Sequence, residues 1–75
     1  MIIKVLGGEV AIGSANTVGG AILVRVVNTG AMANLAISGV GNVTVSNTES
    51  IIVEKTSTTT LTGANMRAAP IAYKG

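Results

Sequence analysis

The sequence predicts an all-β protein, a small antiparallel β-sandwich or barrel of about six to seven short strands. Residues with a branched Cβ are abundant, with ten Val, eight Ile and nine Thr in 75 residues. Such residues suit a pleated sheet better than a helix. Gly and Asn recur at short intervals and supply turns between the strands. No long stretch repeats apolar residues at the 3.6-residue spacing of a helix.

The first half of the chain is expected to hold four strands. Ile2–Leu6 is apolar and ends at a Gly-Gly pair, and Glu9–Ile12 follows as a short second strand. After a loop rich in Gly and Asn, Ala21–Asn28 is the clearest strand of the chain. A turn with the sequence Asn-Thr-Gly separates it from the next strand, Met32–Ile37.

The second half is expected to hold the remaining strands. Asn42–Ser46 alternates with a period of two, which places Val43 and Val45 inward. Ser50–Lys55 is another apolar strand, and the hydroxyl-rich run TSTTT connects it to the end of the chain. The last strand is Met66–Tyr73.

The strand Ala21–Asn28 has apolar residues on both faces. Ile22, Val24 and Val26 point to one side, and Leu23, Arg25 and Val27 to the other. Two interpretations follow for the second face: it belongs to a central strand with partial exposure, or it is a subunit interface.

The last strand contains Pro70, the single proline of the chain. Proline cannot donate a hydrogen bond to a neighbouring strand, so it is confined to an edge or a bulge. We therefore expect Met66–Tyr73 to be an edge strand or to cross from one sheet to another.

The chain is short for a stable monomer. It forms a single domain at most, with residues 1–20 as an N-terminal strand or arm that could reach another subunit and residues 21–75 as the β-sandwich core. A domain of this size buries only about 60% of the surface of its unfolded chain. Cys, His, Trp and Phe are all absent, which excludes disulfides and zinc sites and leaves a core of small apolar residues. Association with itself or with a larger surface is the remaining source of stability.

The residue types argue against an enzyme. Without His, Cys and Asp the chain cannot build a Ser-His-Asp or Cys-His arrangement, and its carboxylate side chains are Glu9, Glu49 and Glu54 alone. We expect no cofactor and no metal. The five basic residues form no cluster, so no nucleic-acid partner is expected. No apolar run reaches the ~20 residues of a membrane helix, and the start lacks the features of a signal peptide.

Two neighbouring charged residues lie at the end of the predicted strand Ser50–Lys55. Glu54 and Lys55 are expected on opposite faces, and Glu54 is a candidate partner for Arg25 across strands. The alternative is that both are solvated charges at a strand end.

The order of several short motifs resembles a known group of proteins. These motifs are LVRVVNTG (Leu23–Gly30), MANLAI, NTESIIVEKTSTTTLTGA (Asn47–Ala64) and the ending PIAYKG. They are similar to small proteins encoded among the virion genes of tailed phages, of the marine and cyanobacterial type. The resemblance covers roughly residues 21–75.

The resemblance implies a structural protein of a phage virion, namely a capsid decoration or cement protein. Such a protein binds the exterior of the shell as a homo-oligomer, with a trimer favoured, and its partners are itself and the major capsid protein. Strand faces and the last strand then suggest the interface residues Leu23, Arg25, Val27, Met66, Arg67, Ile71 and Tyr73. The alternatives are a tail, fibre or other surface-binding β module, a non-viral β assembly protein and a small nucleic-acid-binding barrel.

Overall fold

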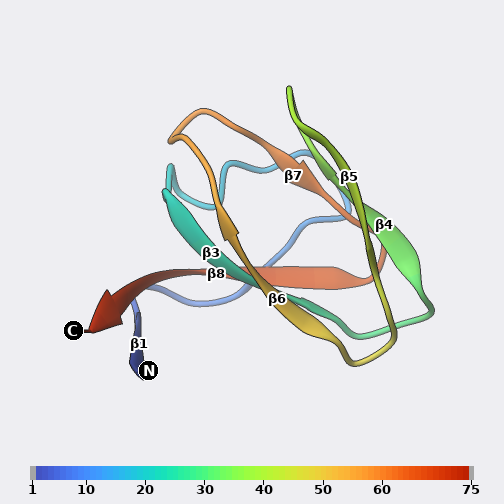
Figure 1. Ribbon diagram of the computed structural model, residues 1–75, viewed down its shortest axis with the longest axis horizontal. Coiled ribbons are helices and arrows are strands. Elements are labelled where there is room, and N and C mark those ends of the chain that lie inside the picture. The colour runs from blue at the N-terminus through green and yellow to red at the C-terminus, as the bar shows by residue number, and fades with distance from the viewer. Residues whose placement is uncertain (1, 75) are drawn as a thin grey trace.

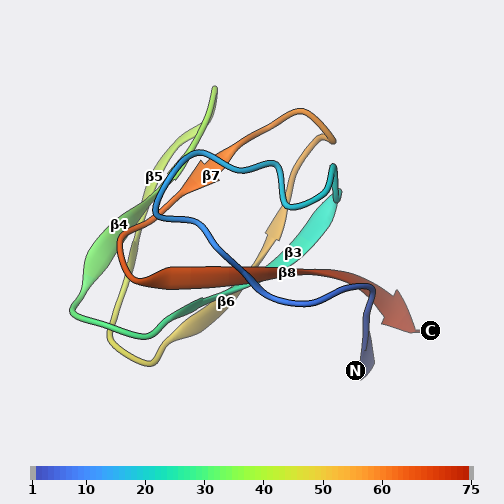
Figure 2. The same cartoon turned by 180° about the vertical axis from the view of Figure 1, so that it is seen from behind.

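The computed structural model describes the backbone of residues 2–74 and the side chains of residues 3–72. Within this part the protein is all-β and has no helix, as the sequence predicts (Figures 1 and 2). Eight strands form two antiparallel sheets, one or two strands more than expected. They are β1 (Ile2–Val5), β2 (Val10–Ala11), β3 (Leu23–Asn28), β4 (Ala33–Ile37), β5 (Gly41–Val45), β6 (Ser50–Glu54), β7 (Leu61–Thr62) and β8 (Met66–Lys74).

The larger sheet has the order β1-β8-β3-β6, and β2 also pairs with β8. The long strand β8 therefore has neighbours on both sides, and the expectation that it is an edge strand or crosses between the sheets is wrong. Val24 on β3 lies opposite Pro70 on β8 and opposite Val53 on β6. β1 pairs with the end of β8, which places Ile2 opposite Lys74.

A bulge in the neighbouring segment explains how a central strand accommodates Pro70. The pairing of β8 with β1 ends at Val5, and its pairing with β2 begins at Val10, so the intervening residues bulge past Pro70. The Leu6 N–H donates to the Pro70 carbonyl at 2.8 Å, which places the proline nitrogen on this same side. Proline has no N–H to donate, but its nitrogen faces the bulge and not β3. No hydrogen bond with β3 is therefore lost.

The smaller sheet has the order β5-β4-β7. A tight turn joins β4 to β5, in which the Val40 N–H donates to the Ile37 carbonyl at 3.0 Å and Gly39 adopts a φ of 75°. β7 has two residues, and an isolated bridge between Asn16 and Leu61 extends its pairing. The sequence predicts a hydroxyl-rich connection leading to Leu61 and no strand at this position.

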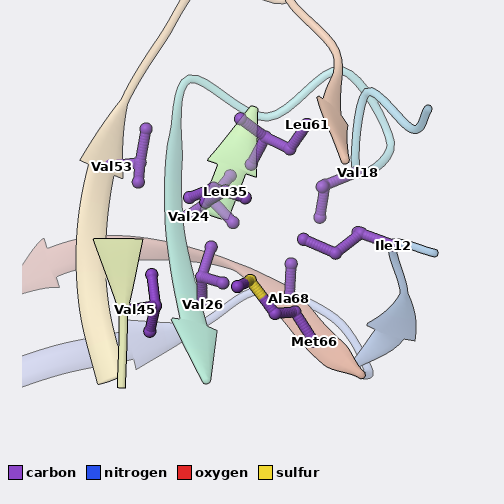
Figure 3. Close-up of a cluster of buried hydrophobic side chains, with 10 residues drawn as sticks. All are labelled: Ile12, Val18, Val24, Val26, Leu35, Val45, Val53, Leu61, Met66 and Ala68. Carbon is purple, nitrogen blue, oxygen red and sulfur yellow. The ribbon is translucent and has the colours of Figure 1, made fainter. Parts of the chain in front are cut away.

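The hydrophobic core lies between the two sheets (Figure 3). β3 alternates as predicted, since Val24 and Val26 are fully buried while its other face is half-buried. Val45 is buried as expected, but Val43 is 43% exposed. The core residues are Ile12, Val18, Val24, Val26, Leu35, Val45, Val53, Leu61, Met66 and Ala68.

The N-terminal segment is integrated into this same fold. β1 and β2 both pair with β8, and Ile12 and Val18 supply two of the core side chains. The division into an arm of residues 1–20 and a core of residues 21–75 therefore does not describe the packing within this chain.

Among the side chains of residues 3–72, two polar ones are buried, and both are hydrogen-bonded. The Asn28 side chain donates to the carbonyls of Ala31 and Val45. Lys55, expected as a solvated charge, is only 9% exposed, and its Nζ donates to the carbonyls of Thr17 at 2.8 Å and Thr56 at 3.2 Å. Desolvation by burial lowers the pKa of the Lys55 ammonium below its ordinary value of 10.5.

Candidate interaction surface

The face of the larger sheet that points away from the core gathers most of the predicted interface residues. Because side chains alternate along a strand, β3 presents to this side the residues that do not enter the core. β6 and β8 flank β3 and add a residue each at neighbouring positions. We call this surface the outer face and define it by Leu23, Arg25, Val27, Ile52 and Arg67.

The apolar part of the outer face follows the β3–β6 pair. Leu23 and Val27 are half-buried, and Ile52 is 40% exposed although it lies in the middle of β6. Ile52 lies directly opposite Arg25. The aliphatic stem of Arg25 therefore continues the apolar strip while its guanidinium remains accessible.

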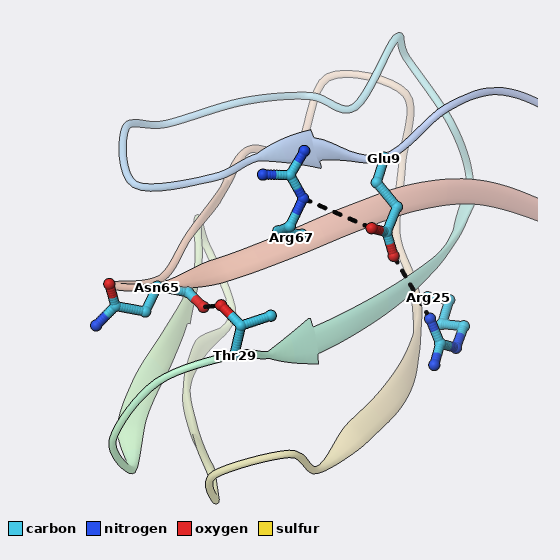
Figure 4. A network of polar contacts seen from close by, with 5 residues as sticks. All are labelled: Glu9, Arg25, Thr29, Asn65 and Arg67. Carbon is cyan, nitrogen blue, oxygen red and sulfur yellow. Dashed lines mark hydrogen bonds and ion pairs between the residues drawn. The ribbon is translucent and has the colours of Figure 1, made fainter.

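The charged part of the outer face consists of two arginines that share one glutamate (Figure 4). Arg25 Nη1 lies 3.7 Å from one carboxylate oxygen of Glu9, and Arg67 Nε lies 3.5 Å from the other. Arg25 lies opposite Ala69 on β8, and this short side chain leaves room for Glu9 to reach across the strand. The arrangement is an Arg-Glu-Arg triad with one excess positive charge.

The triad is better suited to binding than to stabilisation. The three side chains are between 38% and 48% exposed, and ion pairs of this kind contribute about 0–1 kcal/mol to folding. Each guanidinium has five N–H donors, and the contacts with Glu9 involve only one nitrogen of each. The remaining donors match the geometry of a carboxylate on a partner molecule.

The structure brings together four of the seven predicted interface residues. Leu23, Arg25, Val27 and Arg67 lie on the outer face. Met66 is 1% exposed and Ile71 is 2% exposed, so neither side chain contributes to the surface. The Tyr73 backbone pairs with Ile3, and its side chain lies outside the described residues.

Two further residues, Ile52 on the outer face and Glu9 in the triad, are not among the predicted interface residues. Ile52 lies between Ile51 and Val53, so both faces of β6 are apolar, which is the signal that singled out β3. Glu9 could not be found from spacing, because the bulge before β2 places it beside Arg25 and Arg67. The expected pair of Glu54 with Arg25 does not form, since Glu54 lies opposite Leu23 and Arg25 contacts Glu9.

The three carboxylates of the chain do not converge. Glu9 belongs to the triad, Glu49 accepts a hydrogen bond of 2.8 Å from the Ser46 N–H, and Glu54 ends β6. Among the described side chains no group of three or more potential metal ligands is found. Residues 2–74 contain no helix with the length and hydropathy needed to cross a membrane.

A turn contact fixes the end of the outer face beside Arg67. Thr29 donates its hydroxyl hydrogen to the Asn65 carbonyl at 2.7 Å, and the Thr29 N–H donates to the same oxygen at 2.9 Å (Figure 4). Asn65 adopts a φ of 59°, a conformation that Asn tolerates well. These bonds hold the start of β8 against the end of β3 and so set the spacing of the two arginines.

Comparison of the chain with protein-family models, with curated proteins and with solved structures finds no match.

Proposed function

We propose that this chain is a non-enzymatic structural protein of a phage virion that decorates the exterior of the capsid. It associates with itself, binds the major capsid protein and stabilises the shell. The motifs in residues 21–75 that resemble small virion proteins of tailed phages support the proposal. The outer face is the structural observation that carries it, since it joins an apolar strip to an Arg-Glu-Arg triad on one rigid sheet.

The outer face has the composition of a protein-binding surface. The centre of an interface is typically apolar and enriched in Arg, while Lys and Glu are depleted. Leu23, Val27 and Ile52 supply apolar area, and Arg25 lies among them on the strand between β6 and β8. Because these residues belong to paired strands, little conformational entropy is lost when a partner binds.

The partner surface that fits this face is apolar with an acidic side chain at its centre. A carboxylate placed between Arg25 and Arg67 would balance the excess charge of the triad and accept paired hydrogen bonds. A shell built from many copies of one protein repeats such a site, so many weak contacts act together in stabilising the particle.

The small core also favours a function that involves a partner. Eight large apolar residues of the described part are at least 37% exposed, including Val5, Leu6 and Ile22. Any surface that binds the folded chain and not the unfolded one adds to its stability by mass action. Docking on a shell would therefore stabilise the chain as well as the particle.

The proposal is tested by co-sedimentation of the purified chain with shells assembled from the major capsid protein of the same genome. We expect saturable binding, and we expect the double variant Arg25→Ala, Arg67→Ala to bind at least about tenfold more weakly, a loss of about 1.4 kcal/mol. Lys4→Ala is the control, because Lys4 is an exposed cation on β1, outside the outer face. Absence of binding, or equal loss in the control, would contradict the proposal.

A further inference from the structure

The strand β6 forms an open edge of the larger sheet, since β3 is its one partner among the described strands. The Lys55 N–H donates to the Ile22 carbonyl at 2.8 Å, and the Asn28 N–H donates to the Glu49 carbonyl at 3.0 Å. These bonds fix the alternation between β3 and β6 from both ends, because hydrogen-bonded and non-bonded pairs alternate in an antiparallel sheet. The N–H and C=O groups of Ile51 and Val53 therefore face β3. The alternate residues of β6 point their N–H and C=O groups outward.

The outward-facing residues are Ser50, Ile52 and Glu54. They form a row of backbone donors and acceptors with which another strand can pair. Natural edges are usually protected by Lys, Pro, a bulge or a covering loop. β6 contains no Lys or Pro, and its pairing with β3 runs without a bulge.

The strand β5 forms an edge of the smaller sheet and is the other candidate for strand addition. β5 has the same length as β6, but its backbone is less regular. Its first residue, Gly41, has a φ of 144°, which departs from a regular strand. Strand addition is therefore better supported at β6.

We propose that β6 pairs with β6 of a second copy of this chain, antiparallel and centred on Ile52. In this register Ile52 lies opposite Ile52 of the second copy, and Ser50 lies opposite Glu54 at both ends. All these residues point their backbone groups outward, so each pair forms two hydrogen bonds, about six in total. The register satisfies every outward-facing group of the strand.

The side chains are compatible with this pairing. The two half-exposed Ile52 side chains meet on the two-fold axis and cover each other on the outer face. Each Glu54 lies beside a Ser and away from the other Glu54, so no like charges are opposed. On the opposite face, Ile51 lies beside Val53 of the second copy, which extends the apolar surface of the sheet.

This pairing produces a dimer with two-fold symmetry. An antiparallel contact between identical strands is isologous and closes with two copies. The self-association would then start from a dimer, in place of the trimer that the resemblance implies. The inference rests on the self-association part of the proposed function and does not depend on the capsid.

The test is the solution mass of the purified chain by light scattering over a dilution series. The expected result is a reversible dimer with twice the chain mass of 7.4 kDa. Ile52→Lys should raise the dissociation constant at least about tenfold, because it opposes two cations on the axis. Met32→Lys is the matched control, since Met32 is a 67% exposed apolar residue in the loop before β4. Circular dichroism checks that both variants are folded.

A second measurement addresses the register. Since the chain has no Cys, Ile52→Cys introduces a single thiol whose Cα lies about 5.5 Å from its counterpart in a hydrogen-bonded pair. A short bismaleimide should therefore cross-link this variant much faster than Met32→Cys. A monomer at all concentrations, a trimer, or a dimer that Ile52→Lys leaves unchanged would each overturn the inference. If the chain alone is monomeric and Ile52→Lys abolishes binding to shells, Ile52 contacts the shell through the outer face, and self-pairing is likewise excluded.

Discussion

The Asn28 side chain joins the two sheets through a hydrogen bond of 2.8 Å from its Nδ2 to the Val45 carbonyl. The same nitrogen donates to the Ala31 carbonyl at 2.9 Å, and its Oδ1 accepts from the Gly30 N–H at 2.9 Å. Asn28 is fully buried, and the turn after β3 is built around it. The Asn-Thr-Gly turn therefore depends on a core residue that the sequence presents as a simple turn former.

Replacement of Asn28 should destabilise the fold. Asn28→Ala leaves buried backbone groups unpaired, and we expect the free energy of unfolding to fall by about 1–3 kcal/mol. Asn28→Asp loses both donors and places an acceptor beside two carbonyls, so its effect should be larger. Urea denaturation measures both values. Asn34→Ala is the control, because Asn34 is exposed on β4 and should change stability by no more than about 0.5 kcal/mol. Equal effects of Asn28→Ala and Asn34→Ala would refute the role of Asn28.

Gly63 is required by close packing. An added Cβ would overlap the sulfur of Met66 and approach its Cγ at 3.0 Å, and Met66 is itself buried in the core. We expect Gly63→Ala to lower the midpoint of thermal unfolding, by an amount that corresponds to about 1–3 kcal/mol. Gly13→Ala should be nearly neutral, because its Cβ would meet no atom within 4 Å. A neutral Gly63→Ala would show that the Met66 side chain moves aside without cost.

Burial of Lys55 should make stability depend on pH. The pKa of Lys55 is lower in the folded chain than its ordinary value of 10.5, so between these two values the unfolded chain binds more protons. Stability then rises with pH across this interval, because the folded chain no longer has to desolvate a charge. The neutral amine still has two N–H donors for the Thr17 and Thr56 carbonyls.

The measurement compares urea denaturation of the wild type and of Lys55→Met at about pH 7 and about pH 10. The stability of the wild type relative to the variant should increase at the higher pH. Lys4→Met is the control for charge removal, since Lys4 is exposed. A difference that stays constant or shrinks with pH would contradict the buried position of Lys55.

Removal of the shared carboxylate should separate stability from binding. Glu9→Gln should change the free energy of unfolding by less than about 1 kcal/mol, because both ion pairs are exposed. It should strengthen binding to an acidic site on a shell, since Arg25 and Arg67 are then released from Glu9. Glu49→Gln is the matched control with the same charge change in the turn before β6. Weaker shell binding by Glu9→Gln would show that Glu9 itself contacts the partner.

The all-β class and most strands could be predicted from local patterns. Branched residues and turn formers at short intervals predict strands, and the alternation around Val24 and Val26 identifies the core face of β3. The short strand β7 was missed because its two residues have no pattern of their own, and the pairing with β4 defines it.

The predictions that failed depend on contacts between distant segments. Pro70 suggests an edge, and only the bulge between β1 and β2 allows β8 to be central. Lys55 follows a strand and precedes a polar loop, and the loop at Thr17 buries it. On the last strand, Met66 and Ile71 are buried within the chain, which the local sequence does not reveal.

Capsid decoration through the outer face is tested most directly by electron cryomicroscopy of shells with and without the added chain. We expect additional density on the exterior of the shell, with β3, β6 and β8 turned toward the major capsid protein and an acidic side chain near Arg25 and Arg67. Shells without additional density at saturating chain, or density in which the smaller sheet contacts the shell, would contradict it.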